Sequence, residues 1–131
     1  MEPFNDYLDF TLTHRELTEL IRKGNREWRA RLSAVAGVYL ILDAKTGKQY
    51  VGSASGAQGI WGRWSEYADN GHGENKLLKE LVEANASVYP NAFTYSVLQM
   101  LPKTYAREVV LKSEHRYKKK LGSQAFGLNA G

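Results

Sequence analysis

The chain has 131 residues, 18 Lys and Arg against 14 Asp and Glu, and no cysteine. One compact domain is expected at this length, and the missing cysteine excludes a disulfide scaffold, a thiolate metal site and a cysteine nucleophile. No run of about 18 apolar residues occurs, and residues 1–10 carry no basic residue of the kind a secretory signal needs, so we expect a soluble cytoplasmic protein with no membrane partner.

The excess positive charge lies near the C-terminus, where residues 103–131 hold seven basic and two acidic side chains. A local basic patch suits a polyanion such as nucleic acid. Lysines near the end of a helix also complement the helix dipole while they stay solvated. Charge alone therefore leaves both interpretations open.

The N-terminal residues predict two short helices. Residues 13–16 (Thr-His-Arg-Glu) fit a capping box, apolar residues follow at helical spacing, and Gly24 provides a stop. A second helix is expected over about 26–32, where Trp28 and Leu32 share one face.

A β-hairpin is expected next. Residues 38–42 form a continuous apolar run that predicts a strand buried on both faces. Residues 43–48 contain a Thr-Gly pair and predict a tight turn, after which residues 49–53 return as the second strand. Small residues and glycines over 53–59 predict a loop.

The second half of the chain predicts three helices and one strand. Helices are expected over 60–68 and around the apolar residues 77–82, and alternation over 93–98 predicts a half-buried strand. Thr104 is a candidate cap for a long final helix, and a glycine-containing loop follows residue 121. This order predicts an α+β fold with a small three-stranded sheet, mixed or antiparallel, flanked by helices.

Several common catalytic patterns are missing from the sequence. It has no Gly-x-Ser-x-Gly elbow, its three histidines lack metal-ligand spacing, and residues 52–59 lack the Gly-Lys-Ser/Thr ending of a phosphate loop. Polar residues remain where a plain core would not require them. They are Tyr39 and Tyr50 in the expected hairpin, Arg63 and Tyr67 four residues apart on one helix, and Glu114 at the edge of the last apolar stripe.

Each of these residues also has a purely structural alternative. Buried strand tyrosines usually pack their rings and satisfy their hydroxyls locally. Arg63 is placed to pair with Glu66 on the same helix, and Glu114 is placed to pair with Lys118 at i+4. Taken one at a time, these residues do not establish a functional site.

Their joint pattern resembles the GIY-YIG nuclease family. Gly37-Val38-Tyr39 is followed eleven residues later by Tyr50-Val51-Gly52, and both motifs carry valine in place of isoleucine. Arg63, Tyr67, Glu114 and Asn129 then follow in the order that the family shows. The resemblance implies a GIY-YIG-like domain over residues 34–131, preceded by a short helical N-terminal extension over residues 1–33.

The resemblance also implies roles for these residues. Tyr39 and Tyr50 would activate a water, with either one as the general base, and Arg63 would stabilise charge on the scissile phosphate. Tyr67 would orient the phosphate or the water. Glu114 would hold the cofactor, one Mg²⁺ or Mn²⁺ ion per site.

Two further residues complete the implied site. Asn129 would brace the site from the end of the chain, or serve only as a turn residue. His72 lies where some family members keep a polar catalytic helper, or else it only anchors its glycine-flanked loop.

The implied function is that of a divalent-metal-dependent endonuclease. It would hydrolyse DNA phosphodiester bonds in one step by in-line water attack, leaving a 5′-phosphate and a 3′-hydroxyl. Basic side chains of the last helix would contact the DNA backbone; they are Lys112, Arg116, Lys118, Lys119 and Lys120. Trp61 and Trp64 are spaced as core residues rather than as platforms for base stacking.

Target choice would come from a separate specificity domain or a partner protein. One alternative is a non-catalytic nucleic-acid-binding module on the same fold. Another is a protein-interaction domain whose basic helix meets an acidic partner. The sequence leaves the oligomeric state and the preferred DNA open.

Overall fold

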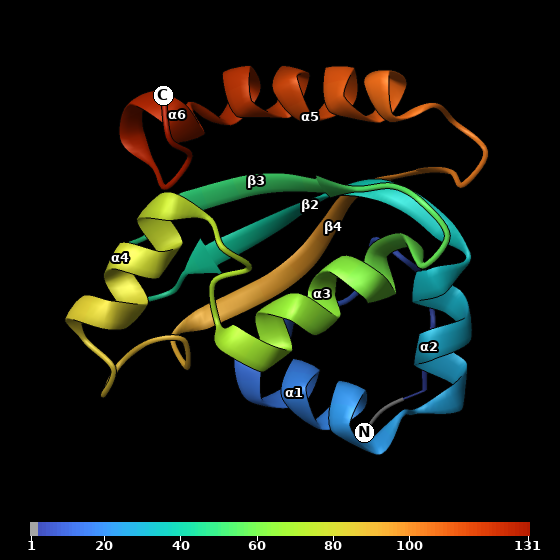
Figure 1. Cartoon of the computed structure of the whole chain (residues 1–131), viewed down its shortest axis with the longest axis horizontal. Helices are drawn as coiled ribbons and strands as arrows, with labels where there is room; N and C mark the ends of the chain where they lie inside the picture. The colour runs from blue at the N-terminus through green and yellow to red at the C-terminus, as the bar shows by residue number, and fades with distance from the viewer. Residues whose placement is uncertain (1–2) are drawn as a thin grey trace.

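A four-stranded antiparallel sheet lies at the centre of the structure, a computed structural model that describes residues 3–131 (Figure 1). Met1 and Glu2, which begin the expected N-terminal extension, lie outside the described residues. The strands are arranged in the order β1-β4-β2-β3. Their bounds are Leu12–Thr13 for β1, Val35–Asp43 for β2, Gln49–Ala54 for β3 and Phe93–Pro102 for β4.

The expectation of three strands was therefore wrong by one. The additional strand, β1, has only two residues, and it pairs with β4 through Leu12 opposite Tyr95 and Thr13 opposite Thr94. Two residues are too few to show the alternation that marks a strand in a sequence. The α+β class and the antiparallel arrangement are confirmed.

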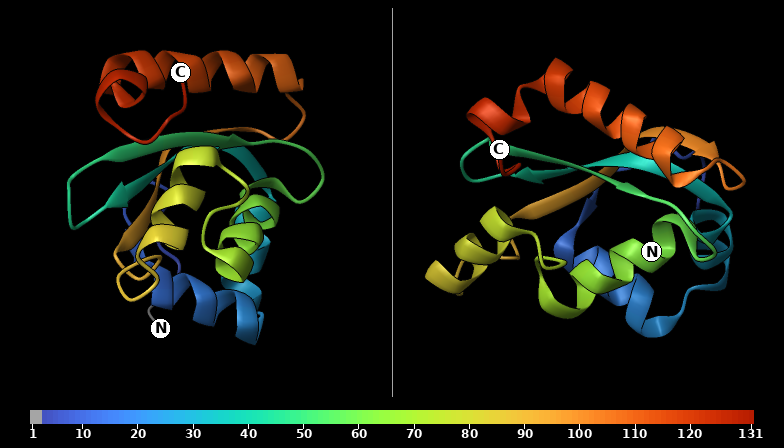
Figure 2. Two further views of the ribbon diagram at one scale, coloured as in Figure 1. Left: turned by 60° about the vertical axis from the view of Figure 1, so that its left-hand side comes forward. Right: turned by 45° about the horizontal axis from the view of Figure 1, so that its top comes forward.

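Helices cover both faces of the sheet, and a single long helix covers one of them. In Figures 1 and 2, α5 lies across one face, while α1, α2 and α3 lie on the other. The helices are α1 (His14–Lys23), α2 (Arg26–Ser33), α3 (Gly59–Asn70), α4 (Lys76–Ala84), α5 (Arg107–Leu121) and the short α6 (Ser123–Phe126). None of the helices described over residues 3–131 is long and apolar enough to cross a membrane.

The N-terminal helices belong to the main hydrophobic core. The expected capping box is present, since Thr13 Oγ1 accepts from the Glu16 N–H and Glu16 Oε1 accepts from the Thr13 N–H. Leu17 and Trp28 are buried in the same cluster as Ile41 of β2 and Ile60 of α3. The expected division of the chain after residue 33 stays a prediction.

The final helix starts later than expected. Thr104 was expected to cap it, but α5 begins at Arg107, and its N-cap residue, Ala106, makes no side-chain capping hydrogen bond. Val110 on α5 packs with Ala36 and Leu101 of the sheet in a small second core. This contact fixes which side of α5 faces the sheet.

The β2–β3 hairpin determines which residues reach each face. Tyr39 lies opposite Gly52, and Ile41 lies opposite Tyr50. Successive side chains of a strand point to opposite faces. Tyr50 therefore lies on the face that carries α3, whereas Ser53 lies on the face that carries α5.

Candidate active site

A cleft of about 830 Å³ opens at the edge of the sheet beside β3. Residues from β2, β3, α3 and α5 line it, together with the loop between β3 and α3. Four of the residues predicted to form a site contribute to its wall: Tyr39, Tyr50, Arg63 and Glu114. The structure thus brings together side chains that lie up to 75 positions apart in the sequence, from Tyr39 to Glu114.

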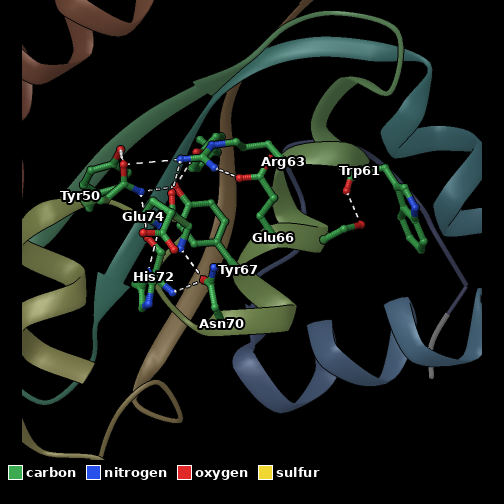
Figure 3. A network of polar contacts seen from close by, with 12 residues as sticks. Tyr50, Trp61, Arg63, Glu66, Tyr67, Asn70, His72 and Glu74 are labelled. Atoms are coloured by element: carbon green, nitrogen blue, oxygen red, sulfur yellow. Dashed lines mark hydrogen bonds and ion pairs between the residues drawn. The ribbon is translucent and has the colours of Figure 1, made fainter. Parts of the chain in front are cut away.

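The tyrosine side of the site is one connected hydrogen-bond network (Figure 3). The Tyr39 and Tyr67 hydroxyl oxygens lie 2.7 Å apart. Asn75 Nδ2 donates to the Tyr67 hydroxyl over 2.7 Å, and the Tyr50 hydroxyl donates to Asn75 Oδ1 over 2.8 Å. Asn75 therefore joins the three tyrosines into a single chain of contacts.

All three tyrosines in this network are held in the neutral form. Burial raises the pKa of Tyr39 well above 10, with a further increase from Tyr50, while the Arg63 guanidinium opposes the increase. Burial likewise raises the pKa values of Tyr50 and Tyr67. At neutral pH each hydroxyl therefore keeps its proton and acts through hydrogen bonds.

Arg63 brings a positive charge into the cleft from α3. Its Nη2 donates to the Gly73 carbonyl over 3.0 Å, its Nη1 pairs with Glu66, and its guanidinium lies 5.0 Å from the centre of the Tyr67 ring. Burial alone would lower the pKa of Arg63, but Tyr67, Tyr39 and Glu66 outweigh burial and raise it. The guanidinium group is therefore held in one orientation, and it stays positively charged at every physiological pH.

Glu114 reaches the same cleft from the other face of the sheet. Its Oε1 accepts from the Ser53 hydroxyl over 2.7 Å, and its Oε2 lies 3.0 Å from Lys118 Nζ. The site therefore surrounds the edge strand β3, with tyrosines and arginine on one side and a carboxylate on the other. The predicted alternative pairings, Arg63 with Glu66 and Glu114 with Lys118, are both present.

The two motif glycines are needed because other groups occupy the space beside them. A Cβ on Gly52 would lie 2.5 Å from both Cζ and the hydroxyl oxygen of Tyr39. A Cβ on Gly37 would lie 2.6 Å from the Gln99 carbonyl of β4. The missing side chain of Gly52 thus leaves space for the Tyr39 ring, and that of Gly37 lets the backbones of β2 and β4 approach each other.

Three predicted site residues support the site without lining the cleft. Asn129 is buried and bonds both backbone groups of Val51, accepting from its N–H over 2.8 Å and donating to its carbonyl over 2.9 Å. Tyr67 is fully buried beneath Tyr39. His72 accepts from the Glu74 N–H through Nδ1, a contact within its own loop, and its role as a catalytic helper stays a prediction.

The predicted DNA-contacting residues do not share one face of α5. Arg107, Leu111 and Glu114 recur at intervals of three and four residues and line the cleft. Lys118 lies one turn beyond Glu114 and is outside the lining, but its Nζ reaches Glu114 Oε2. The remaining basic residues of this helix are exposed and lie outside the lining of the cleft: Lys112, Arg116, Lys119 and Lys120. Trp61 and Trp64 are buried core residues.

Three residues near the chemistry were not predicted. Asn75 is an N-cap residue whose side chain turns to the tyrosines instead of capping α4. Ser53 and Arg107 line the cleft together with Glu114. Helical spacing from Glu114 is the signal in the sequence that would have identified Arg107. The contacts of Asn75 have no counterpart in the local sequence pattern.

The donor set fits a hard divalent cation held mainly by substrate and water. Over residues 3–131 no group of three or more His, Cys, Asp or Glu side chains could hold a metal ion. A closed, all-protein metal cage is therefore not present in this part of the chain. A single carboxylate beside a hydroxyl, in an open cleft, suits Mg²⁺, which keeps several waters and takes few protein ligands.

The structure is similar to solved nuclease domains. One, the catalytic domain of the homing endonuclease I-TevI, is 26% identical, covers 73% of this chain and 98% of its own, and has a TM-score of 0.56. A mutant form of the catalytic domain of the intron endonuclease I-TevI is 25% identical, with coverage of 74% and 94% and a TM-score of 0.56. This chain has the GIY-YIG catalytic-domain fold. No family model and no curated protein matches the chain.

The GIY-YIG fold confirms the resemblance stated from the two motifs. It supports a nuclease, in keeping with the homing endonuclease that shares this fold. It also gives the cleft a chemical context, because the residues that resemble the family's motifs are those that line or support it.

Proposed function

We propose that this chain is a divalent-metal-dependent endonuclease that hydrolyses DNA phosphodiester bonds by in-line attack of water. The products would carry a 5′-phosphate and a 3′-hydroxyl. The observation that supports this proposal most directly is the convergence of Tyr39, Tyr50, Arg63 and Glu114 on one open cleft. A module that only binds DNA has no need of a buried tyrosine network beside an arginine and a carboxylate.

Arg63 is suited to stabilise the phosphate as it becomes pentavalent. Its guanidinium stays charged, and its contacts with Gly73 and Glu66 fix its orientation before substrate arrives. Preorganised charge of this kind lowers the barrier because no reorganisation is needed as charge develops. Replacing one such donor typically costs about a hundredfold to a thousandfold in rate.

The tyrosines are suited to position the attacking water. The Tyr50 hydroxyl donates its hydrogen bond to Asn75, so its oxygen lone pairs can accept a hydrogen bond from water in the cleft. Tyr39 lines the same space, and its hydroxyl is held by Tyr67. Since the pKa of each is raised, a tyrosine would act as a base only when cationic groups in the loaded site favour its phenolate form.

Glu114 would hold the cation, with the Ser53 hydroxyl beside it. When bound, Mg²⁺ or Mn²⁺ would supply Lewis-acid stabilisation of the phosphate oxygens. Glu114 would hold the cation from α5, whereas Arg63 reaches the same cleft from α3.

We also propose that DNA binds through its backbone. Arg107 lines the cleft, and α5 carries exposed lysines outside it. Such contacts do not read bases and weaken with salt. Target choice would then come from a separate domain or partner.

The test is cleavage of a substrate panel that contains supercoiled plasmid, single strands, flaps and branched duplexes. Wild type, Glu114→Ala and Arg63→Ala are assayed with Mg²⁺, Mn²⁺ and EDTA. Glu19→Ala and Arg22→Ala serve as matched controls, because these residues form an exposed ion pair on α1. Ligation of the nicks by a DNA ligase reports a 5′-phosphate beside a 3′-hydroxyl.

We expect metal-dependent cutting that both site variants lose and both control variants keep. Cutting that persists in EDTA or in Glu114→Ala would contradict the metal-dependent mechanism. No cutting, together with salt-sensitive DNA binding that is equal in all variants, would favour a non-catalytic binding module. Binding to an acidic protein in place of DNA would favour an interaction domain.

A further inference from the structure

Lys118 occupies the carboxylate that the proposed cation would need. Its Nζ lies 3.0 Å from Glu114 Oε2, while the Ser53 hydroxyl occupies Oε1. Both oxygens of Glu114 therefore already have a partner. An ammonium and a metal ion are both cations, so they compete for the same negative charge.

The environment of this ion pair distinguishes it from the other lysine–glutamate pairs of the described chain. The Lys118 and Glu114 side chains are only 19% and 17% exposed. Lys23 and Glu19 on α1 have the same 3.0 Å separation and the same i, i+4 spacing, but they are 65% and 47% exposed. Screening by water makes exposed pairs weak, whereas a partly buried pair keeps more of its attraction.

We propose that Lys118 is a built-in counter-ion that holds Glu114 until a divalent cation displaces it, and that it thereby sets the metal affinity of the site. The inference rests on the proposed function, in which Glu114 is the metal ligand. Once displaced, the Lys118 ammonium lies next to Glu114, which lines the cleft, and a DNA phosphate bound there would be its partner. Metal binding and DNA contact are then coupled through one side chain.

The geometry of α5 supports this exchange. Glu114 and Lys118 are one helical turn apart, so the lysine can leave the carboxylate by rotating its own flexible stem without moving the helix. Ser53 keeps its hydrogen bond to Oε1 and holds the carboxylate in place.

The experiment measures Mn²⁺ binding to the DNA-free protein by electron paramagnetic resonance of the unbound ion. The variants are Lys118→Met, which keeps the apolar stem and removes the charge, and Lys118→Arg, which keeps the charge. Lys23→Met is the matched control, because it removes an equally spaced but exposed lysine. Glu114→Ala identifies the site.

We expect Lys118→Met to bind Mn²⁺ about threefold to tenfold more tightly than wild type, the range that loss of one competing ion pair gives. Lys118→Arg and Lys23→Met should bind like wild type, and Glu114→Ala should lose the site. In thermal unfolding, the same Mn²⁺ concentration should raise the Tm of Lys118→Met more than that of wild type.

Two outcomes would overturn the inference, and they differ in what they leave standing. If Glu114→Ala loses Mn²⁺ but Lys118→Met binds it no more tightly than wild type, Lys118 is not a competitor and the proposed nuclease function stands. If Glu114→Ala binds Mn²⁺ as wild type does, both the inference and the proposed metal role of Glu114 fail.

Discussion

Gly52 lies directly opposite Tyr39 in the β2–β3 register, and the Tyr39 ring occupies the space beside its Cα. A Cβ at Gly52 would lie 2.5 Å from the Tyr39 hydroxyl oxygen, which itself is 2.7 Å from that of Tyr67. Position 52 in the second motif therefore requires glycine, because the Tyr39 ring packs against it.

We expect Gly52→Ala to displace the Tyr39 ring and to lower both stability and activity. Overpacking of this kind costs about 1–3 kcal/mol of unfolding free energy. Urea denaturation measures the loss. Gly131→Ala is the control, since nothing lies within 4 Å of a Cβ there, and equal stability of the two variants would contradict the packing argument.

Replacing Asn75 by Leu should disconnect Tyr50 from Tyr67. The change keeps the approximate size of the side chain but removes the acceptor for Tyr50 and the donor to Tyr67. We expect cleavage to fall by more than about tenfold and stability by about 1–3 kcal/mol, the cost of leaving buried polar groups unpaired.

A double-mutant cycle separates these two effects of Asn75→Leu. If Asn75 acts through the Tyr50 hydroxyl, then Asn75→Leu and Tyr50→Phe together should reduce the rate by less than the product of their single effects. Strictly multiplicative effects on the rate would show that Asn75 does not act through Tyr50.

Asn129 should prove to be a stability residue as well as a site residue. Its amide makes two hydrogen bonds with the backbone of Val51, between Tyr50 and Gly52. Asn129→Ala leaves a buried N–H and a buried carbonyl unpaired, so we expect a loss of about 2–4 kcal/mol. Asn129→Asp can still accept from Val51 but cannot donate, and chemical denaturation should place its stability between alanine and wild type.

Asp43 should make the fold sensitive to acid. Burial opposes its ionisation, but hydrogen bonds from the Tyr89 hydroxyl at 2.6 Å, the Thr46 hydroxyl at 2.7 Å and the Lys45 N–H at 3.0 Å outweigh burial and lower its pKa. A lowered pKa adds stability that is present above the unfolded pKa of about 3.9 and is lost as pH falls through the folded pKa.

Unfolding free energy measured from pH 6 down to pH 2 tests this contribution. We expect the wild type to lose more stability over this range than Asp43→Asn, whose amide still accepts from Tyr89 but does not titrate. If wild type and Asp43→Asn lose the same unfolding free energy over this pH range, Asp43 is not the source of the acid sensitivity. Tyr89 shares the bond, and Asp43 raises its pKa to about 12.

Local signals in the sequence predicted much of the fold. The capping box at Thr13 and the stop at Gly24 mark the ends of α1, and the apolar run that continues through Ile41 marks β2. Strand β1 could not be predicted, because its two residues are ordered by pairing with β4 rather than by their own pattern. The start of α5 was misplaced because Thr104 has the chemistry of a cap but not the position.

The candidate site, like the fold, could be predicted from the sequence only in part. Tyr39, Tyr50 and Glu114 were predicted from motif order, and the structure places them around one cleft. Asn75 could not be predicted, because what marks it is contact with two tyrosines that are 25 and 8 residues away in sequence. The competition of Lys118 for Glu114 likewise depends on burial, which the i+4 spacing does not reveal.

The hydrogen bonds between Asn129 and Val51 affect whether two copies of the chain can associate through the edge of the sheet. β3 is an edge strand, and an open edge is a template on which a second chain can add a strand. Asn129 takes up the N–H and carbonyl of Val51, and Leu128 donates its N–H to the Gln49 carbonyl. The C-terminal segment thus occupies backbone groups of β3 on which a second chain could pair, and we expect proteolytic trimming there to promote aggregation.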